Sequence, residues 1–242
     1  MSMDDNNDTP IAIITGGSGY VGQAIVKTFI EDGWLPIIAS RIPYTVKGAE
    51  VIVCDITNGK SVSQLVKKVV EKHDSISACI HAAAPETTRK PLIEISSKIF
   101  DNEFDVSVRG AYLLARETTP YMKENSAFIG ITTHSLETPN SIERNIGAYL
   151  PAKQALRALL RTLSYELEEK KIRVYAVAPK FMPGGLNSSL PERVRTLLSR
   201  QDDGSTTSAD DVASVVSKIC KGTSAFPPGT SVAIPSKVVT SL

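Results

Sequence analysis

The sequence predicts an α/β protein with a Rossmann-like, doubly wound parallel sheet of about seven strands, folded as a single domain. Short, almost wholly apolar runs alternate with longer amphipathic stretches along the 242 residues. Apolar strands are typical of sheets covered on both faces, and strands separated by helices pair in parallel through right-handed crossovers. No repeat, linker or low-complexity block divides the chain, so we expect a flexible N-terminus over residues 1–10 and one domain over residues 11–242.

Seven apolar runs are the expected strands. They are residues 11–15, 35–40, 50–53, 77–82, 127–132, 173–178 and 231–234. The expected helices are a stretch that ends near residue 32, then residues 61–71, 97–118, 145–169, 192–199 and 209–221. Ser61 is a candidate helix cap, Pro120 ends the helix before it, and Pro151 is tolerated only in a first turn. Ligands of such folds bind at the carboxyl ends of the strands.

The composition argues against several kinds of partner. Lys and Arg number 27 and Asp and Glu 26, so the formal net charge of +1 favours neither nucleic acid nor an anionic membrane. The N-terminus lacks the basic and apolar regions of a signal peptide, and no apolar run approaches the roughly 18 residues that span a bilayer. The three cysteines form no Cys-x-x-Cys pair, so we interpret them as reduced and mostly buried. We therefore expect a cytoplasmic protein without a metal site.

A glycine-rich turn directly follows the first expected strand. Glycines permit a tight turn and let backbone N–H groups approach a pyrophosphate, while the following helix presents its positive end to that anion. The place of this turn between a strand and a helix favours dinucleotide binding over a plain structural turn. The residues expected to hold the cofactor here are Thr15, Gly16, Ser18, Gly19, Tyr20, Val21 and Gly22.

Tyr149 and Lys153 lie four residues apart in the helix after the fifth strand, so they share one helical face. A lysine ammonium beside a phenol favours the phenolate and lowers the phenol pKa from about 10. The tyrosine can then exchange a proton with a carbonyl or alcohol oxygen near neutral pH. Because Tyr-x-x-x-Lys also occurs often by chance, its place in the fold decides the interpretation.

The order of these motifs resembles the short-chain dehydrogenase/reductase family, in which a Tyr-x-x-x-Lys pair opens this same helix. The short form of the family carries Thr-Gly-x-x-x-Gly-x-Gly, whereas this chain has Tyr20 at the middle glycine. Gly16, Gly19 and Gly22 instead match Thr-Gly-x-x-Gly-x-x-Gly, which is typical of the extended and atypical branches. The chain length suits the short form, and the resemblance extends over residues 11–234.

The end of the second strand bears on the choice between NADP and NAD. An acid there would hydrogen-bond the ribose of NAD and repel a 2′-phosphate. This chain has Ser40 and Arg41 instead, and a guanidinium can pair with that phosphate and stack on adenine. We therefore expect NADP, with NAD as the less favoured cofactor, although a loop arginine is also often simply solvated.

The resemblance implies further cofactor contacts at the ends of later strands. These are Asp55, Ile56, Ala82, Ala83, Ala84 and Pro179, together with Tyr149 and Lys153. Asp55 would bind the adenine amino group, although a lone Asp after a strand is commonly a turn residue. His81 is interpreted as structural, and Lys180 departs from the Pro-Gly that relatives commonly carry after the sixth strand.

A hydroxyl after the fifth strand completes the catalytic set that the resemblance implies, because it binds the substrate oxygen. Alignment on the strand favours Thr133 for this role, whereas the spacing to Tyr149 favours Ser135, and both alternatives stay open. Many relatives also carry an asparagine on the long helix that supports a proton-relay water. Ser107 stands at that position, so it either helps to hold a water or is plain helix packing.

We interpret the chain as an NADP-dependent oxidoreductase that interconverts a carbonyl and a secondary alcohol, with Tyr149 as general acid and base. No residue identifies the small-molecule substrate. The alternative is a nucleotide-binding regulatory or non-catalytic relative, because Tyr20, Ser107 and Lys180 depart from the family pattern.

Relatives commonly pair through their two long helices, and five leucines over residues 156–167 exceed one apolar stripe. We therefore expect a homodimer or homotetramer; the alternative is that all five leucines face the sheet.

Overall fold

The computed structural model describes residues 9–137, 145–188, 190–199, 206–234 and 239–241. Most of the expected flexible N-terminus, residues 1–8, lies outside these ranges. The strands are β1 (Ile11–Thr15), β2 (Leu35–Ser40), β3 (Glu50–Val53), β4 (Ile76–His81), β5 (Met122–Ile131), β6 (Arg173–Pro179), β7 (Thr230–Ile234) and β8 (Val239–Ser241). The α-helices are α1 (Tyr20–Glu31), α2 (Gly59–His73), α3 (Ser97–Phe104), α4 (Gly110–Thr118), α5 (Tyr149–Glu166), α6 (Glu192–Ser199) and α7 (Ala209–Cys220).

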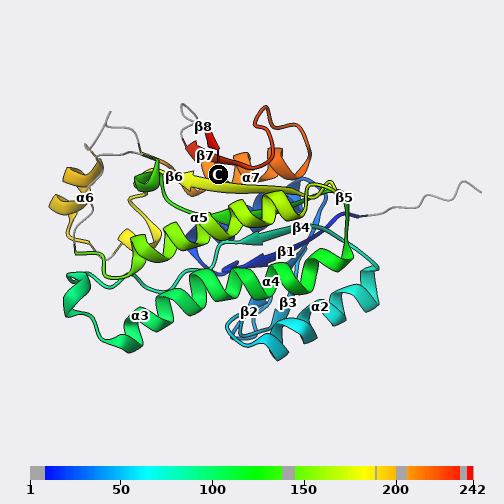
Figure 1. Ribbon diagram of the computed structural model, residues 1–242, viewed down its shortest axis with the longest axis horizontal. Helices are drawn as coiled ribbons and strands as arrows, with labels where there is room; N and C mark the ends of the chain where they lie inside the picture. Colours follow the sequence, from blue (N-terminus) through cyan, green and yellow to red (C-terminus); the bar gives the residue numbers. More distant parts are fainter. Residues whose placement is uncertain (1–8, 138–144, 189, 200–205, 235–238, 242) are drawn as a thin grey trace, which may run out of the picture.

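One sheet organises the molecule, with its strands in the order β3-β2-β1-β4-β5-β6-β7-β8. The strands from β1 to β7 pair in parallel, which confirms the predicted doubly wound sheet. β8 adds an antiparallel edge strand that the sequence analysis missed. The helices α2, α4 and α5 cover the near face of the sheet in Figure 1, and α7 covers the far face. The strand order turns back between β1 and β4, which makes the crevice above these two strands the expected ligand site.

Alternate residues of the central strand face two separate cores. Ile11 and Ile13 of β1 belong to one core and Ala12 and Ile14 to the other, because successive side chains of a strand point to opposite faces. The first core contains buried residues of α2, α4 and α5, and the second contains those of α1 and α7. Both faces of β1 are therefore buried, which explains why its first four residues are all apolar. Among the helices described, none has both the length and the apolar character needed to cross a membrane.

The two long helices expected from the sequence differ in detail from the structure. The helix expected over residues 97–118 is divided, because a π-helical turn over Asp105–Arg109 separates α3 from α4. A π turn inserts a single extra residue, which an amphipathic pattern over a long stretch does not reveal. The helix expected from residue 145 begins at Tyr149, so Pro151 falls in its first turn, where it is tolerated.

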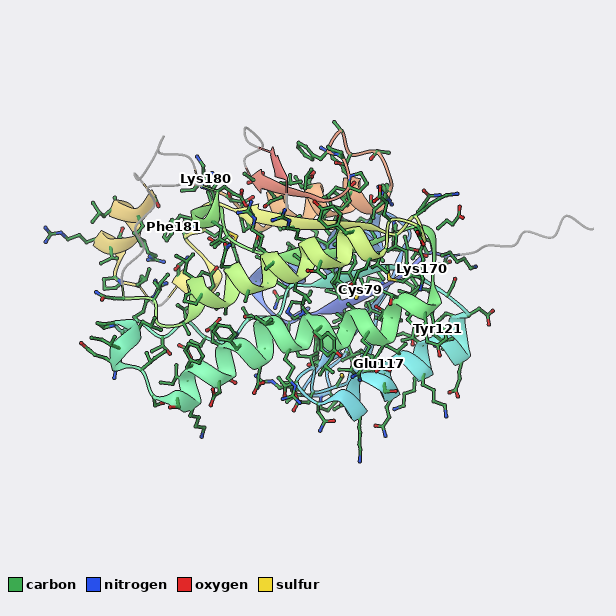
Figure 2. All side chains as sticks on the ribbon, in the orientation of Figure 1. Cys79, Glu117, Tyr121, Lys170, Lys180 and Phe181 are labelled. Carbon is green, nitrogen blue, oxygen red and sulfur yellow. The ribbon has the colours of Figure 1, made fainter. Side chains whose placement is uncertain are left out.

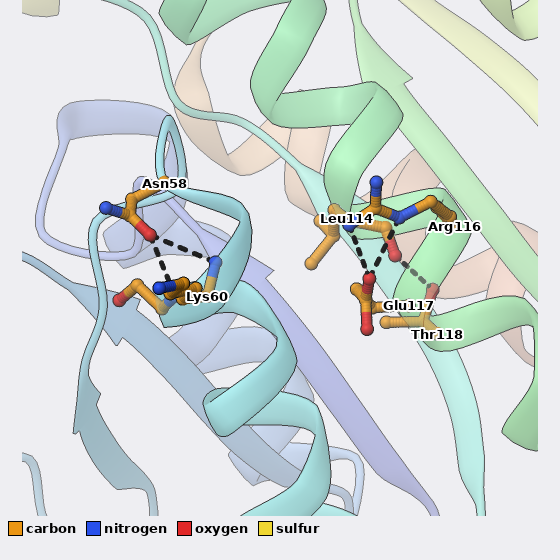
Figure 3. Close-up of polar contacts among 7 residues, drawn as sticks. Asn58, Lys60, Leu114, Arg116, Glu117 and Thr118 are labelled. Atoms are coloured by element: carbon orange, nitrogen blue, oxygen red, sulfur yellow. Dashed lines mark hydrogen bonds and ion pairs between the residues drawn. The ribbon is translucent and has the colours of Figure 1, made fainter.

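The start of α2 depends on a side-chain cap, shown in Figure 3. The sequence suggested Ser61 as this cap, but α2 begins earlier and its cap is Asn58. The side-chain oxygen of Asn58 accepts hydrogen bonds from the backbone N–H groups of Lys60 at 3.0 Å and Ser61 at 3.2 Å. Nearby, at the end of α4, the hydroxyl of Thr118 donates to the carbonyl of Leu114 at 2.8 Å (Figure 3). Because α2 packs on α4, the cap supports the near face of the sheet.

We expect Asn58→Ala to lower the free energy of unfolding by about 1 kcal/mol, because two N–H groups of α2 lose their acceptor. Asn58→Ser, which retains an oxygen at the cap, should stay close to wild type. Urea unfolding followed by far-ultraviolet circular dichroism measures both variants. Equal stability of the alanine and serine variants would show that the cap contributes nothing.

Candidate active site

A cleft of about 1510 Å³ opens at the carboxyl ends of the parallel strands. Its wall brings together most of the residues predicted from the motifs. These are Gly16, Ser18, Gly19, Tyr20, Val21, Gly22, Ser40, Arg41, Asp55, Ile56, Ala82, Ala83, Ala84, Thr133, Ser135, Tyr149, Lys153 and Pro179. Two predicted residues, Thr15 and Ser107, do not line the cleft, because both are fully buried behind it. Either residue would act on a bound molecule only through its neighbours.

The glycine-rich turn forms the part of the wall where a pyrophosphate would lie. Gly16 has a φ of +71°, and a Cβ added there would lie 2.7 Å from the backbone nitrogen of Ala83. A Cβ added at Gly22 would lie 2.0 Å from the carbonyl oxygen of Gly16. Both positions therefore require glycine, the first for its backbone conformation and both for close approach.

The N-terminus of α1 opens into the cleft without a side-chain cap. Its N-cap residue is Gly19, and its first turn contains no acid. The helices α2, α3 and α7, in contrast, are capped by the side chains of Asn58, Ser96 and Ser208. Free backbone N–H groups and the positive end of a helix attract anions. The turn and the helix terminus together fit the diphosphate of a dinucleotide.

Tyr20, which replaces the middle glycine of the short-form motif, contacts the opposite side of the cleft. A Cβ added at Gly184 would lie 2.7 Å from the Tyr20 ring, and one added at Gly185 would lie 2.9 Å from the Cβ of Tyr20. The ring therefore rests on this glycine pair, which follows β6. The sequence placed Tyr20 in the cofactor turn but did not reveal its partners, because they lie far away along the chain.

Thr15 and His81 join the ends of β1 and β4 behind the cleft. The hydroxyl oxygen of Thr15 lies 3.0 Å from Nδ1 of His81, and it accepts a hydrogen bond from the backbone N–H of Ala83 at 3.4 Å. Burial, with a smaller effect of the Lys153 charge, lowers the pKa of His81 to about 3. The imidazole is therefore neutral at physiological pH, in keeping with the structural role expected for it.

The residues after β2 and β3 form the end of the cleft where an adenosine would lie. The hydroxyl of Ser40 donates to the carbonyl of Ile42 at 2.8 Å and shapes this turn, while Arg41 is exposed on the cleft wall. The carboxylate of Asp55 accepts hydrogen bonds from the backbone N–H and the hydroxyl of Thr57, at 2.9 and 2.8 Å. Asp55 is thus a turn residue that also faces the cleft, so its two alternative interpretations are compatible.

Tyr149 and Lys153 lie on one face at the start of α5, as predicted. Lys153 is 4% exposed, and its Nζ donates to the carbonyl of Ile131 at 2.8 Å. The same Nζ lies 5.7 Å from the centroid of the Tyr149 ring. Burial lowers the pKa of Lys153 to about 8, and the charge of Glu103 opposes that shift. The ammonium form therefore still predominates at neutral pH beside the phenol.

Thr133 and Ser135 both line the cleft after β5, so the structure keeps both alternatives for the third catalytic residue. The hydroxyl of Thr133 donates to that of Ser135 at 3.3 Å and accepts a hydrogen bond from the backbone N–H of Ser135 at 3.4 Å. Thr133 is buried, whereas Ser135 is partly exposed. The two hydroxyls are coupled, so a substrate oxygen bound to one would be influenced by the other.

The other end of the cleft is mainly apolar and lies beside α6. It is lined by Phe181, Met182, Leu186, Leu190, Val194 and Leu198. In Figure 2, Lys180 and Phe181 lie at this end of the sheet, whereas Lys170 and Tyr121 lie at the opposite end.

The sequence analysis missed Arg89, which lines the cleft and donates a hydrogen bond to the side-chain oxygen of Asn187. No motif contains this arginine. The one signal in the sequence was its place after β4, because the segments that follow the parallel strands line the cleft.

Glu103, on α3, is a second polar residue that the sequence analysis missed. It is 4% exposed, and the hydroxyl of Ser107 donates to its Oε1 at 3.3 Å. Burial raises the pKa of Glu103, while the charge of Lys153 and the hydrogen bond from Ser107 oppose that rise. The spacing of four residues to Ser107 was visible in the sequence, but nothing there showed that this face of the helix is buried.

Comparison with known proteins places these features in a family. A family model described as enoyl-(acyl carrier protein) reductase matches residues 21–235. The chain is 28% identical over 241 residues to human dehydrogenase/reductase SDR family member 2, mitochondrial, covering 93% of this chain and 84% of that protein.

Two solved structures share the fold. A 3-ketoacyl-(acyl-carrier-protein) reductase from Brucella melitensis, complexed with NADH, matches with a TM-score of 0.75 and 22% identity, covering 93% of this chain and 96% of that chain. A short chain dehydrogenase from Burkholderia cenocepacia, in complex with NADP, matches with a TM-score of 0.81 and 20% identity, covering 94% and 96%.

We expect Gly22→Ala to lower the free energy of unfolding by about 1–3 kcal/mol, because its Cβ meets backbone atoms that can move only with the turn. Gly59→Ala is the matched control, since a Cβ at this first residue of α2 would meet nothing closer than 3.5 Å. Urea unfolding of the purified protein without added ligand measures both. A Gly22→Ala variant as stable as the control would mean that the turn has more room than the structure gives it.

Proposed function

This chain belongs to the short-chain dehydrogenase/reductase family, and on that premise we propose that it is an NADP-dependent oxidoreductase acting on a carbonyl or secondary alcohol. The observation that carries the proposal is the buried Lys153 beside Tyr149 on the wall of the same cleft as the uncapped α1 terminus. A proton-exchanging pair and an anion-binding turn therefore face one space. NADPH oxidation in the presence of a panel of ketones, aldehydes and oxoacyl thioesters tests the proposal.

Each residue of the pair has a defined task in this mechanism. A bound nicotinamide cofactor would supply hydride to the carbonyl carbon, or accept it in the reverse direction. Tyr149 gives its proton to the carbonyl oxygen as the alcohol forms, and Lys153 favours the resulting phenolate electrostatically. Lys153 would also hold the ribose of a bound cofactor. Thr133, or Ser135 in its place, donates a hydrogen bond to the substrate oxygen and polarises it.

The preference for NADP rests on the end of β2. Arg41 is exposed on the cleft wall directly after this strand, and the adjacent Ser40 offers no carboxylate to repel a 2′-phosphate. The similar Brucella melitensis reductase was solved with NADH and the Burkholderia cenocepacia dehydrogenase with NADP. Relatives of this fold thus accommodate either cofactor, and Arg41 is the local feature that favours NADP here.

A second candidate function is nucleotide binding without turnover. Ser107 favours it, because this residue stands where the resemblance implies a relay asparagine and its hydroxyl is directed to Glu103 instead. Tyr20 and Lys180 also depart from the pattern of catalytic relatives. Binding of NADPH without oxidation by any substrate in the panel would support this alternative.

We also propose a cytoplasmic homodimer or homotetramer that pairs through α4 and α5. The five leucines do not supply this interface, because Leu156, Leu160 and Leu167 are buried in the core of the chain itself and the other two pack, partly buried, against that core. The exposed Tyr112 on α4 and Tyr165 on α5, at 47% and 65% exposure, offer apolar surface on this side of the molecule. Pairing through these helices would cover that surface.

Tyr149→Phe should lower turnover by about 100-fold or more while leaving NADPH affinity unchanged, because the variant loses only its proton donor. Lys153→Ala should lower both turnover and NADPH affinity, since the lysine serves the phenol and the ribose. The two losses of turnover should be far from additive, because the residues act as a unit. Steady-state kinetics and fluorescence titration measure these effects. Near-normal turnover of Tyr149→Phe would remove the proposed mechanism and leave a nucleotide-binding protein.

NADPH should bind more tightly than NADH to the wild type. Arg41→Ala should weaken NADPH binding by about 10-fold to 100-fold, because a charge-assisted contact to the 2′-phosphate is lost. NADH affinity should not change, since NADH lacks that phosphate. Titration with both cofactors at one fixed ionic strength gives the comparison. Equal affinities in the wild type would argue against the NADP assignment.

A further inference from the structure

A buried carboxylate behind the cleft has no part in the mechanism described above. Glu103 on α3 is 4% exposed, and the hydroxyl of Ser107 donates to it across one helical turn. Burying an ionised carboxylate is costly unless an opposite charge lies near it. We therefore expect a positively charged side chain in the same part of the interior as Glu103.

Lys153 is that cation. It is also 4% exposed, and it belongs to α5, which packs against both α3 and the π-helical turn that contains Ser107. Each charge stabilises the charged form of the other, because the ammonium lowers the pKa of Glu103 and the carboxylate raises that of Lys153. The ion pairs within 4.0 Å among the described residues do not include this pair, so the two groups attract without direct contact.

Neither the histidine nor the nearest aspartate supplies a free negative charge to Lys153. His81 on β4 is neutral, with Nε2 lacking a hydrogen bond of standard geometry. Tyr149 presents its ring to the ammonium at 5.7 Å. On the π-helical turn, Asp105 pairs with Arg109 at 3.6 Å, and both side chains are exposed to solvent. Within the described residues, Glu103 is therefore the carboxylate that acts on Lys153.

We propose that Glu103 is a positioning residue whose negative charge keeps the buried Lys153 protonated, with Ser107 holding the carboxylate in place. The inference rests on the proposed function for the task of Lys153, because only an ammonium can favour the phenolate. An asparagine at position 107 would offer a neutral amide, whereas this chain has a serine there and an acid one turn earlier. The acid and the serine thus form one unit, in which the carboxylate supplies the charge and the hydroxyl fixes its direction.

Glu103→Gln is the central variant, because it keeps the size of the side chain and an acceptor for Ser107 while removing the charge. In the wild type, the affinity for NADPH should fall as pH rises through about 8, where Lys153 loses its proton. In Glu103→Gln this midpoint should lie about one pH unit lower, since the amine has lost its counter-charge. Asp101→Asn removes the same charge from an exposed position on α3 and should leave the midpoint unchanged. Equal midpoints in the wild type and Glu103→Gln would overturn the proposal.

A measurement without cofactor separates this proposal from the proposed function. Because the pKa of Lys153 in the folded protein lies below its unfolded value, the folded protein gains stability as pH rises from about 8 toward 10.5. The rise should begin about one pH unit lower in Glu103→Gln. In a Lys153→Met background, Glu103→Gln should no longer affect this alkaline region. An unchanged onset contradicts the role of Glu103 whether or not NADPH binds, whereas failure of the wild type to bind NADPH contradicts only the proposed function.

Ser107→Ala provides a second route if Glu103→Gln does not fold. Removing the hydroxyl leaves the carboxylate in place but weakens its charged form, because one hydrogen bond to it is lost. The pH at which the stability of the folded protein begins to rise should then be lower than in the wild type, as in Glu103→Gln, but by a smaller amount. An onset identical to that of the wild type would contradict the proposal here too.

Discussion

The cleft depends on how closely the chain after β1 approaches the chain after β4. Gly16 leaves no room for a Cβ against Ala83, and Gly22 leaves none against Gly16, so the first turn is compressed between a helix and a strand end. The hydrogen bond between Thr15 and His81 holds the two strand ends at this distance. The open N-terminus of α1 and the adjoining wall of the cleft take their positions from this contact.

A second constraint comes from the polar groups buried behind the cleft. His81, Glu103 and Lys153 share a region from which water is largely excluded, and burial shifts each of them toward its neutral form. His81 is neutral at physiological pH and lies between the strand ends as an uncharged side chain. The pKa values of Glu103 and Lys153 shift less than burial alone would shift them, because each group stabilises the charged form of the other. Lys153 thus keeps its ammonium form beside the ring of Tyr149.

The fold and the main part of the site could be predicted because they depend on local sequence. Buried parallel strands are apolar on both faces, and Tyr149 and Lys153 share a helical face by spacing alone. Glu103 escaped prediction because burial of a charged residue depends on the elements that pack over it. The contact of Tyr20 with Gly184 and Gly185 joins segments that no local pattern connects. The hydrogen bond between the hydroxyls of Thr133 and Ser135 likewise depends on the turn after β5, which the strand pattern does not specify.

The short strand β8 changes which backbone groups are free to form hydrogen bonds at the edge of the sheet. It occupies the backbone groups of β7 that would otherwise face outward, with Val232 opposite Val239. Among the described strands, the two borders of the sheet are then β8 itself, with three residues, and β3, which spans Glu50–Val53 and carries an ion pair between Glu50 and Lys72. A short, charged border gives another chain little backbone to hydrogen-bond. Short strands at both borders thereby disfavour the joining of copies of this protein into a continuous sheet.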